Sequence, residues 1–132
     1  MKNAKALKNF GKLIDIMARL RSSEGCAWDK KQTHESLLKY LTSETKEVRA
    51  AVKKGDHENI CEELGDVLLQ VVFHAQIAKE SKNFDIADVI DVLNKKLVRR
   101  HPHVFGKNKT KDVKKIIAQW NEIKKMEMKK TK

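Results

Sequence analysis

The chain has 132 residues, enough for one domain with a buried core, and it is 40% hydrophobic and 36% charged with a net charge of +11. Two cysteines, Cys26 and Cys61, are too few for a disulfide framework and lack the spacing of a zinc site. No apolar run approaches the roughly eighteen residues that span a membrane, and residues 1–13 lack the apolar core of a signal peptide. We therefore expect a soluble, cytoplasmic protein with no membrane partner.

The small number of helix-breaking residues predicts an all-α fold. The chain has five glycines, one proline and 5% aromatic residues, with abundant Lys, Glu, Leu, Ala and Ile. Helical periodicity of the apolar residues places helices at about residues 4–21, 33–55, 56–81, 86–102 and 112–128. We expect a helical bundle of four to five helices that forms a single domain over residues 1–132, with a Lys-rich tail from about residue 124. The segments 21–30 and 101–106 are predicted to be loops.

The second and third predicted helices are separated by a very short turn. Thr33 suits the N-cap of the second helix, and Gly55 suits the position just after its last turn. Asp56 suits the N-cap of the third helix. Because the turn is so short, the two helices are expected to pack antiparallel as a central hairpin.

Four acidic residues lie inside the apolar stretches of this predicted hairpin. Glu44 and Glu47 are three residues apart, as are Glu63 and Asp66, so each pair lies side by side on its helix. Glu47 precedes Gly55 by eight residues and Glu63 follows it by eight, which places the two pairs at the same height along the hairpin. Burying four carboxylates together is strongly unfavourable unless they are protonated or share a cation. The pattern predicts a site for Mg²⁺, with Mn²⁺ as a substitute; the alternative is that the acids lie on ordinary solvated helix faces.

Basic and aromatic residues elsewhere are candidates for binding the substrate of such a site. No histidine accompanies the four acids, so the ligands favour Mg²⁺ over zinc and, in a basic protein, a polyphosphate substrate. Lys96 and Arg100, four residues apart, suit phosphate binding, with a solvated basic patch as the alternative. Trp28, with Lys30 close by, suits stacking on a base, or else it covers the core. Trp120 lies on an apolar helical face, which indicates packing at the border of the pocket.

The end of the chain is strongly basic. Residues 107–132 carry ten lysines against three acidic residues, which suits binding to nucleic acid or to anionic substrates. A catalytically weak, nucleic-acid-binding helical protein is therefore one alternative. Four clustered acids serve no purpose in such a protein, so nucleic acid is disfavoured as a partner.

Several motifs occur in a fixed order between residues 13 and 128. They are Gly25-Cys26-Ala27-Trp28-Asp29 with Gln32-Thr33-His34, then Glu62-Glu63-Leu64-Gly65-Asp66 with Leu68 to Ala75, then Lys96 to Gly106, and finally Trp120 to Lys124. Together they resemble the MazG nucleotide pyrophosphohydrolase family. The chain departs from the family pattern at Ser43, where Glu is common, at Lys46, where an aromatic residue is usual, and at Ala27, where Pro is usual. The acid missing at Ser43 is one that could orient or activate water.

The resemblance implies an all-α enzyme that hydrolyses nucleoside triphosphates to the monophosphate and pyrophosphate, with Mg²⁺ held by Glu44, Glu47, Glu63 and Asp66. Our own hypothesis for the mechanism is that water attacks the α-phosphorus, with Glu63 as a catalytic carboxylate and Glu62, beside the ligand pair, as a candidate to orient the water. The resemblance also implies a homodimer or homotetramer whose subunits jointly form the active sites, and a house-cleaning role in the nucleotide pool. The alternative on the same fold is a pyrophosphatase with a narrow substrate, such as dUTP, dCTP or phosphoribosyl-ATP.

Overall fold

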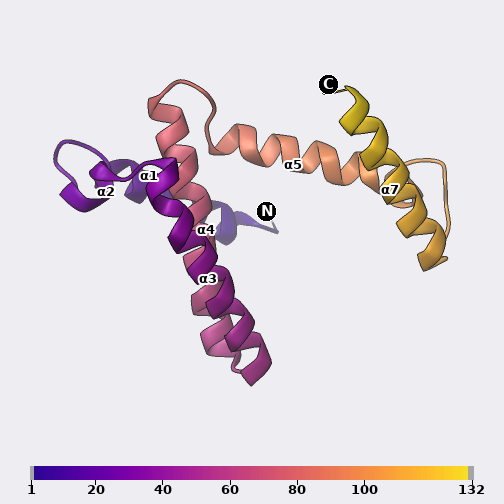
Figure 1. Ribbon diagram of the computed structural model, residues 1–132, viewed down its shortest axis with the longest axis horizontal. Coiled ribbons are helices and arrows are strands. Elements are labelled where there is room, and N and C mark those ends of the chain that lie inside the picture. Colours follow the sequence, from indigo (N-terminus) through magenta and orange to yellow (C-terminus); the bar gives the residue numbers. More distant parts are fainter. Residues whose placement is uncertain (1, 131–132) are drawn as a thin grey trace. The chain divides into compact units, whose positions relative to one another are not determined.

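The computed structural model describes residues 2–130, and this part of the chain contains helices and no strand (Figure 1). The helices are α1 (Ala4–Leu20), α2 (Ala27–Lys31), α3 (His34–Lys54), α4 (His57–Glu80), α5 (Ile86–Arg100), α6 (Pro102–Phe105) and α7 (Val113–Lys130). The predicted all-α fold is confirmed. No helix within residues 2–130 is long and apolar enough to cross a membrane.

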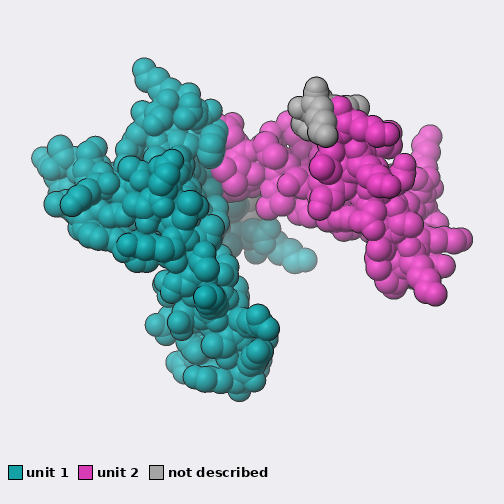
Figure 2. Space-filling view, in the orientation of Figure 1, with its two compact units in different colours: residues 1–86 teal, residues 87–132 magenta. Residues whose placement is uncertain are grey.

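The chain divides into two compact units, residues 1–86 and residues 87–132 (Figure 2). The first unit contains α1 to α4, and the second contains nearly all of α5 together with α6 and α7. The single domain expected over residues 1–132 stays a prediction.

The first unit is built around the hairpin of α3 and α4, which pack side by side along their length (Figure 1). The Thr33 side chain accepts a hydrogen bond from the Ser36 backbone N–H at 3.1 Å, and the Ser36 hydroxyl accepts one from the Thr33 N–H at 2.8 Å. Gly55 ends α3 with φ of 68°, a left-handed conformation that favours glycine. Asp56 caps α4 by accepting from the Asn59 N–H at 3.2 Å. These three residues confirm the predicted hairpin and its turn.

The buried core lies at the end of the hairpin opposite the turn, where α1 packs on α4. It contains Met17 of α1, Leu37 of α3, and Val72, Phe73 and Ile77 of α4. Outside this core, several apolar residues of the hairpin are 37–57% exposed: Leu38, Val52, Leu64, Leu68 and Val71. The first unit therefore has an uncovered apolar surface on the same two helices that carry the acidic residues.

Two short helices contradict the predicted loops. Residues 21–30 contain most of α2, and residues 101–106 contain α6. Helix α6 begins at Pro102, and proline suits the first position of a helix as well as the end of the preceding one. Helix α2 has only five residues and no side-chain N-cap, so local propensity does not predict it. Hydrogen bonds to the end of α1 and ring contacts of Trp28 with Tyr40 and Phe73 stabilise it.

Candidate metal centre

Three of the four predicted carboxylates meet on the hairpin. One oxygen each from Glu44 of α3 and from Glu63 and Asp66 of α4 lies within 4.8 Å of the others, and all three residues are half-buried. Glu44 stands eleven residues before Gly55 and Asp66 eleven after it, so the short turn brings them to the same height. Glu63 joins them because it lies one turn from Asp66 on the same face of α4.

The mutual proximity of these groups perturbs their ionisation. Partial removal from water, followed by the negative charges of Asp66 and Glu47, raises the pKa of Glu44 above its ordinary value. Partial removal from water also raises the pKa of Glu63. Repulsion from neighbouring negative charges adds to this rise, and these charges belong to Asp66, Glu47, Glu44 and Glu62. A bound cation would relieve this repulsion.

The three oxygens suit a small hard cation. In octahedral coordination at about 2.1 Å, opposite ligand oxygens are about 4.2 Å apart, so a group within 4.8 Å needs only small side-chain adjustments to close on one ion. A set of three half-buried carboxylates matches the preference of Mg²⁺ or Mn²⁺ for oxygen ligands and lacks the nitrogen and sulfur ligands of zinc. The residues present therefore fit such an ion.

The remaining predicted acids lie beside this group. Glu47 is exposed and lies one turn along α3 from Glu44. It does not belong to the three-oxygen group, but its negative charge contributes to the raised pKa of both Glu44 and Glu63. Glu62 is exposed next to Glu63 and acts on it in the same way. The role of Glu47 as a fourth ligand and that of Glu62 in catalysis stay predictions.

Trp28 and Lys30 both lie on α2, in the first unit. The Trp28 ring meets Tyr40 of α3 edge-on, with centroids 5.7 Å apart, and Phe73 of α4 at 6.5 Å. The Trp28 side chain is nevertheless 49% exposed, and Lys30 is exposed. Tyr40 precedes Glu44 by about one turn of α3, so Trp28 offers an open aromatic surface a short distance along the hairpin from the carboxylates.

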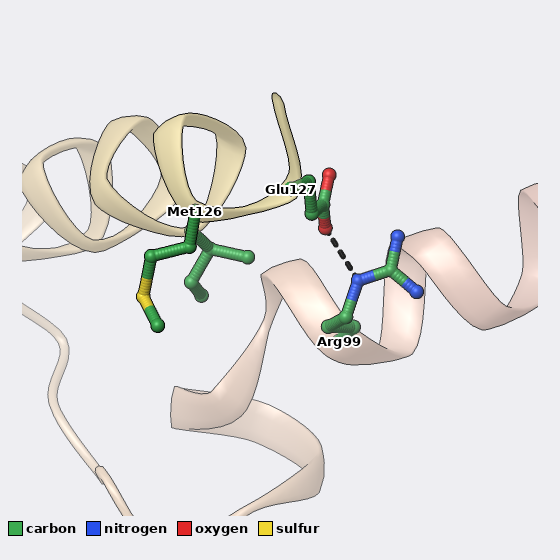
Figure 3. A pocket seen from close by; sticks show the side chains of 4 residues that line it. Arg99, Met126 and Glu127 are labelled. Carbon is green, nitrogen blue, oxygen red and sulfur yellow. Dashed lines mark hydrogen bonds and ion pairs between the residues drawn. The ribbon is translucent and has the colours of Figure 1, made fainter. Parts of the chain in front are cut away.

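The other predicted substrate residues belong to the second unit. The Arg100 guanidinium lies 5.1 Å from the Trp120 ring centroid and donates to Glu127 Oε1 from Nη2 at 2.7 Å and from Nε at 3.1 Å. Arg99 pairs with the same Glu127 carboxylate, beside a pocket of about 220 Å³ that Ile123 and Met126 also line (Figure 3). Hydrogen bonds from Arg99 and then from Arg100 lower the pKa of Glu127 to about 2.

Lys96 is half-buried on α5, one turn before Arg100. The substrate-binding roles of Lys96, Arg100 and Trp120 stay predictions, as do those of Trp28 and Lys30. Sequence reasoning missed Glu127, because no local pattern links a glutamate near the end of α7 to arginines at the end of α5.

Comparison with known proteins gives consistent matches. Residues 32–105 match the family model of the MazG nucleotide pyrophosphohydrolase domain. The chain is 55% identical over 118 residues to the nucleoside triphosphate pyrophosphohydrolase/pyrophosphatase MazG of Thermotoga maritima, covering 89% of this chain and 45% of that protein. It is 42% identical over 119 residues to the nucleoside triphosphate pyrophosphohydrolase of Escherichia coli K12, again covering 89% and 45%. The chain thus spans a little under half the length of these curated relatives.

One solved structure is similar to this chain along nearly the whole length of the solved protein. The crystal structure of a mazG-related protein from Thermotoga maritima superposes with a TM-score of 0.71 at 34% sequence identity, covering 87% of this chain and 98% of that one.

Proposed function

Because the chain belongs to the MazG nucleotide pyrophosphohydrolase family, we propose that it hydrolyses nucleoside triphosphates to the monophosphate and pyrophosphate in a Mg²⁺-dependent reaction. The observation that carries this proposal is the group of three carboxylate oxygens within 4.8 Å on the hairpin. A nucleotide substrate also agrees with the net charge of +11, which attracts polyphosphates.

The carboxylates have distinct roles in the proposed reaction. Glu44, Glu63 and Asp66, with Glu47 beside them, would hold Mg²⁺, for which Mn²⁺ is a substitute. The ion would neutralise triphosphate charge and lower the pKa of the attacking water. Glu62 or Glu63 orients that water towards the α-phosphorus, and pyrophosphate leaves from the opposite side.

The candidate substrate-binding residues of each unit have proposed roles of their own. Trp28 stacks on the base and Lys30 adds a positive charge from the same helix. Lys96 and Arg100 neutralise the departing pyrophosphate, with Trp120 packing against Arg100. Arg100 donates to the Glu127 carboxylate in the structure, so a phosphate oxygen, which is an acceptor of the same kind, would share or replace that partner.

The proposal includes a homodimer or homotetramer acting in the cytoplasm to clear unwanted nucleotides. The exposed apolar side chains of the hairpin support self-association: Leu38, Val52, Leu64, Leu68 and Val71. A second copy packed on this surface would also exclude water from the adjacent carboxylates.

The position of attack can be tested with isotopically labelled water. Hydrolysis in H₂¹⁸O with Mg²⁺, followed by mass spectrometry, is expected to place one ¹⁸O atom in the nucleoside monophosphate and none in pyrophosphate. Label in pyrophosphate or in inorganic phosphate would show attack at the β- or γ-phosphorus and would overturn the mechanism. A panel that includes dUTP, dCTP and phosphoribosyl-ATP beside the common triphosphates separates a broad enzyme from one with a narrow substrate.

A further inference from the structure

Arg21 is a buried charged residue that the proposed mechanism does not use. It lies at the C-terminal end of α1 and is 6% exposed. Its Nε and Nη2 donate to the two carboxylate oxygens of Glu80, at the end of α4, both at 2.9 Å. This bidentate pair lowers the pKa of Glu80, chiefly through the hydrogen bond from Arg21.

The third nitrogen of the same guanidinium holds α2. Nη1 donates to the backbone carbonyl of Asp29 at 2.5 Å and to that of Gln32 at 3.1 Å. Both carbonyls lie at the C-terminal end of α2, where few carbonyls have intrahelical partners, and that of Asp29 also accepts from the Gln32 N–H at 3.3 Å. The charge of Arg21 is also favourable there, because the C-terminal end of a helix is partially negative.

The other end of α2 is fixed to the same place. The Cys26 N–H donates to the carbonyl of Leu20, the last residue of α1, at 2.8 Å. A Cβ atom at Gly25 would lie 2.2 Å from the Arg19 carbonyl oxygen, so only glycine fits the tight path between α1 and α2. A five-residue helix is unstable alone, so it depends on contacts such as these to the end of α1 and on the ring contacts of Trp28 with Tyr40 and Phe73.

Helix α2 carries Trp28 and Lys30, the two candidate substrate residues of the first unit. Arg21 lies against the surface on which Trp28 rests, because its guanidinium is 5.7 Å from the ring centroid of Phe73. The same Phe73 ring meets Trp28 edge-on. Arg21 thus connects the end of α4, the end of α2 and the aromatic group under Trp28.

We propose that Arg21, held by Glu80, is a positioning residue that fixes α2 so that Trp28 and Lys30 face the nucleotide. This proposal rests on the proposed function. Without the guanidinium, α2 samples other positions, and only a fraction of molecules presents Trp28 correctly. If that fraction is about one tenth, the apparent affinity for nucleotide falls about tenfold.

The test compares Arg21→Lys with Glu80→Gln and with Arg49→Lys, a matched control at an exposed position of α3. Lysine keeps the charge but cannot bond Glu80 and two carbonyls at once. We expect Arg21→Lys to raise KM for nucleotide about tenfold with kcat changed by less than about twofold. Glu80→Gln, which leaves the bonds from Arg21 to α2 possible, is expected to have a smaller effect in the same direction, and Arg49→Lys none.

A spectroscopic readout makes the test independent of turnover. In a Trp120→Phe background, Trp28 is the sole tryptophan. Arg21→Lys is expected to shift its emission to longer wavelength and to increase its quenching by acrylamide. A folded Arg21→Lys variant with unchanged Trp28 emission and unchanged KM would overturn the proposal. If Arg21→Lys does not fold, Glu80→Gln decides by the same readouts. If the wild type itself releases no pyrophosphate, the proposed function fails, while the Trp28 emission still decides whether Arg21 fixes α2.

Discussion

The histidine pair between α3 and α4 makes the stability of the hairpin sensitive to mild acid. Nδ1 of His34, the first residue of α3, lies 2.8 Å from Nδ1 of His74 on α4. The ring planes are within 4° of parallel, with centroids 5.0 Å apart. Face-to-face packing keeps ring atoms about 3.5 Å apart, so the 2.8 Å separation is an N–H···N hydrogen bond in which one nitrogen must be unprotonated.

The environment of His74 opposes a positive charge. Burial, and then repulsion from His34, lower the pKa of His74 below its ordinary value. Its buried Nε2 has no hydrogen-bond partner within the part of the chain that the structure describes. Protonating both rings would direct two N–H groups at each other, so the folded pair binds at most one proton beyond its neutral form, whereas the unfolded chain binds two.

The sign and size of the effect follow from this difference. Because His74 takes up a proton near the ordinary histidine pKa of about 6.5 in the unfolded chain and only at lower pH in the folded one, stability falls as the pH decreases below about 6.5. One proton corresponds to about 1.4 kcal/mol per pH unit, or about 2 kcal/mol between pH 6.5 and 5.0. Partial exposure of the pair to solvent reduces this to about 1 kcal/mol, which shifts Tm by about 4 °C.

The assay is urea unfolding at pH 7.5, 6.5 and 5.0 for the wild type, His74→Gln and His57→Gln. His57 is an exposed histidine at the start of α4 and is the matched control. The acidic cluster is the same in all three proteins, so its pH-dependent contribution to the free energy of unfolding cancels when the variants are compared with the wild type. We expect His74→Gln to lose less stability on acidification than the wild type by about 1 kcal/mol, and His57→Gln to behave like the wild type. Parallel losses in the wild type and His74→Gln would refute the reasoning.

Three further predictions concern the hairpin. Mg²⁺ at about ten times its Kd is expected to stabilise the wild type by about 1.4 kcal/mol in thermal unfolding, and Asp66→Asn to lose most of this gain; equal gains would remove Asp66 from the metal site. Leu37→Ala is expected to cost about 3–5 kcal/mol in urea unfolding, because Leu37 is completely buried among α1 and α4 side chains, and a cost below about 1 kcal/mol would contradict that packing. Gly55→Ala is expected to destabilise by about 1 kcal/mol because its φ is 68°, and a neutral or stabilising result would show that the turn adopts another conformation.

The parts of the fold that could be predicted depend on local signals. The cap at Thr33, the left-handed residue Gly55 and the cap at Asp56 act within one helical turn, so the sequence alone located the hairpin. Once the turn is placed, helical geometry brings the acids together, which is why Glu44, Glu63 and Asp66 meet as expected.

The features that were missed depend on partners far apart in the chain. Helix α2 is held by Arg21, whose carboxylate partner Glu80 is 59 residues away. His34 and His74 are separated by 40 residues, and Arg100 and Glu127 by 27. Helical periodicity says which face of a helix is apolar but not which polar residues meet across helices, so these pairs required the structure.

The most direct test of the central claim is pyrophosphate release from nucleoside triphosphates by the wild type and by Glu63→Gln, each with Mg²⁺ and with EDTA. Glu58→Gln, an exposed acid at the start of the same helix, is the matched control. The wild type and Glu58→Gln are expected to release pyrophosphate and nucleoside monophosphate in equal amounts with Mg²⁺ and neither with EDTA. Glu63→Gln is expected to be nearly inactive while remaining folded. Release that persists in EDTA, or in a folded Glu63→Gln variant, would contradict a metal-dependent reaction centred on these carboxylates.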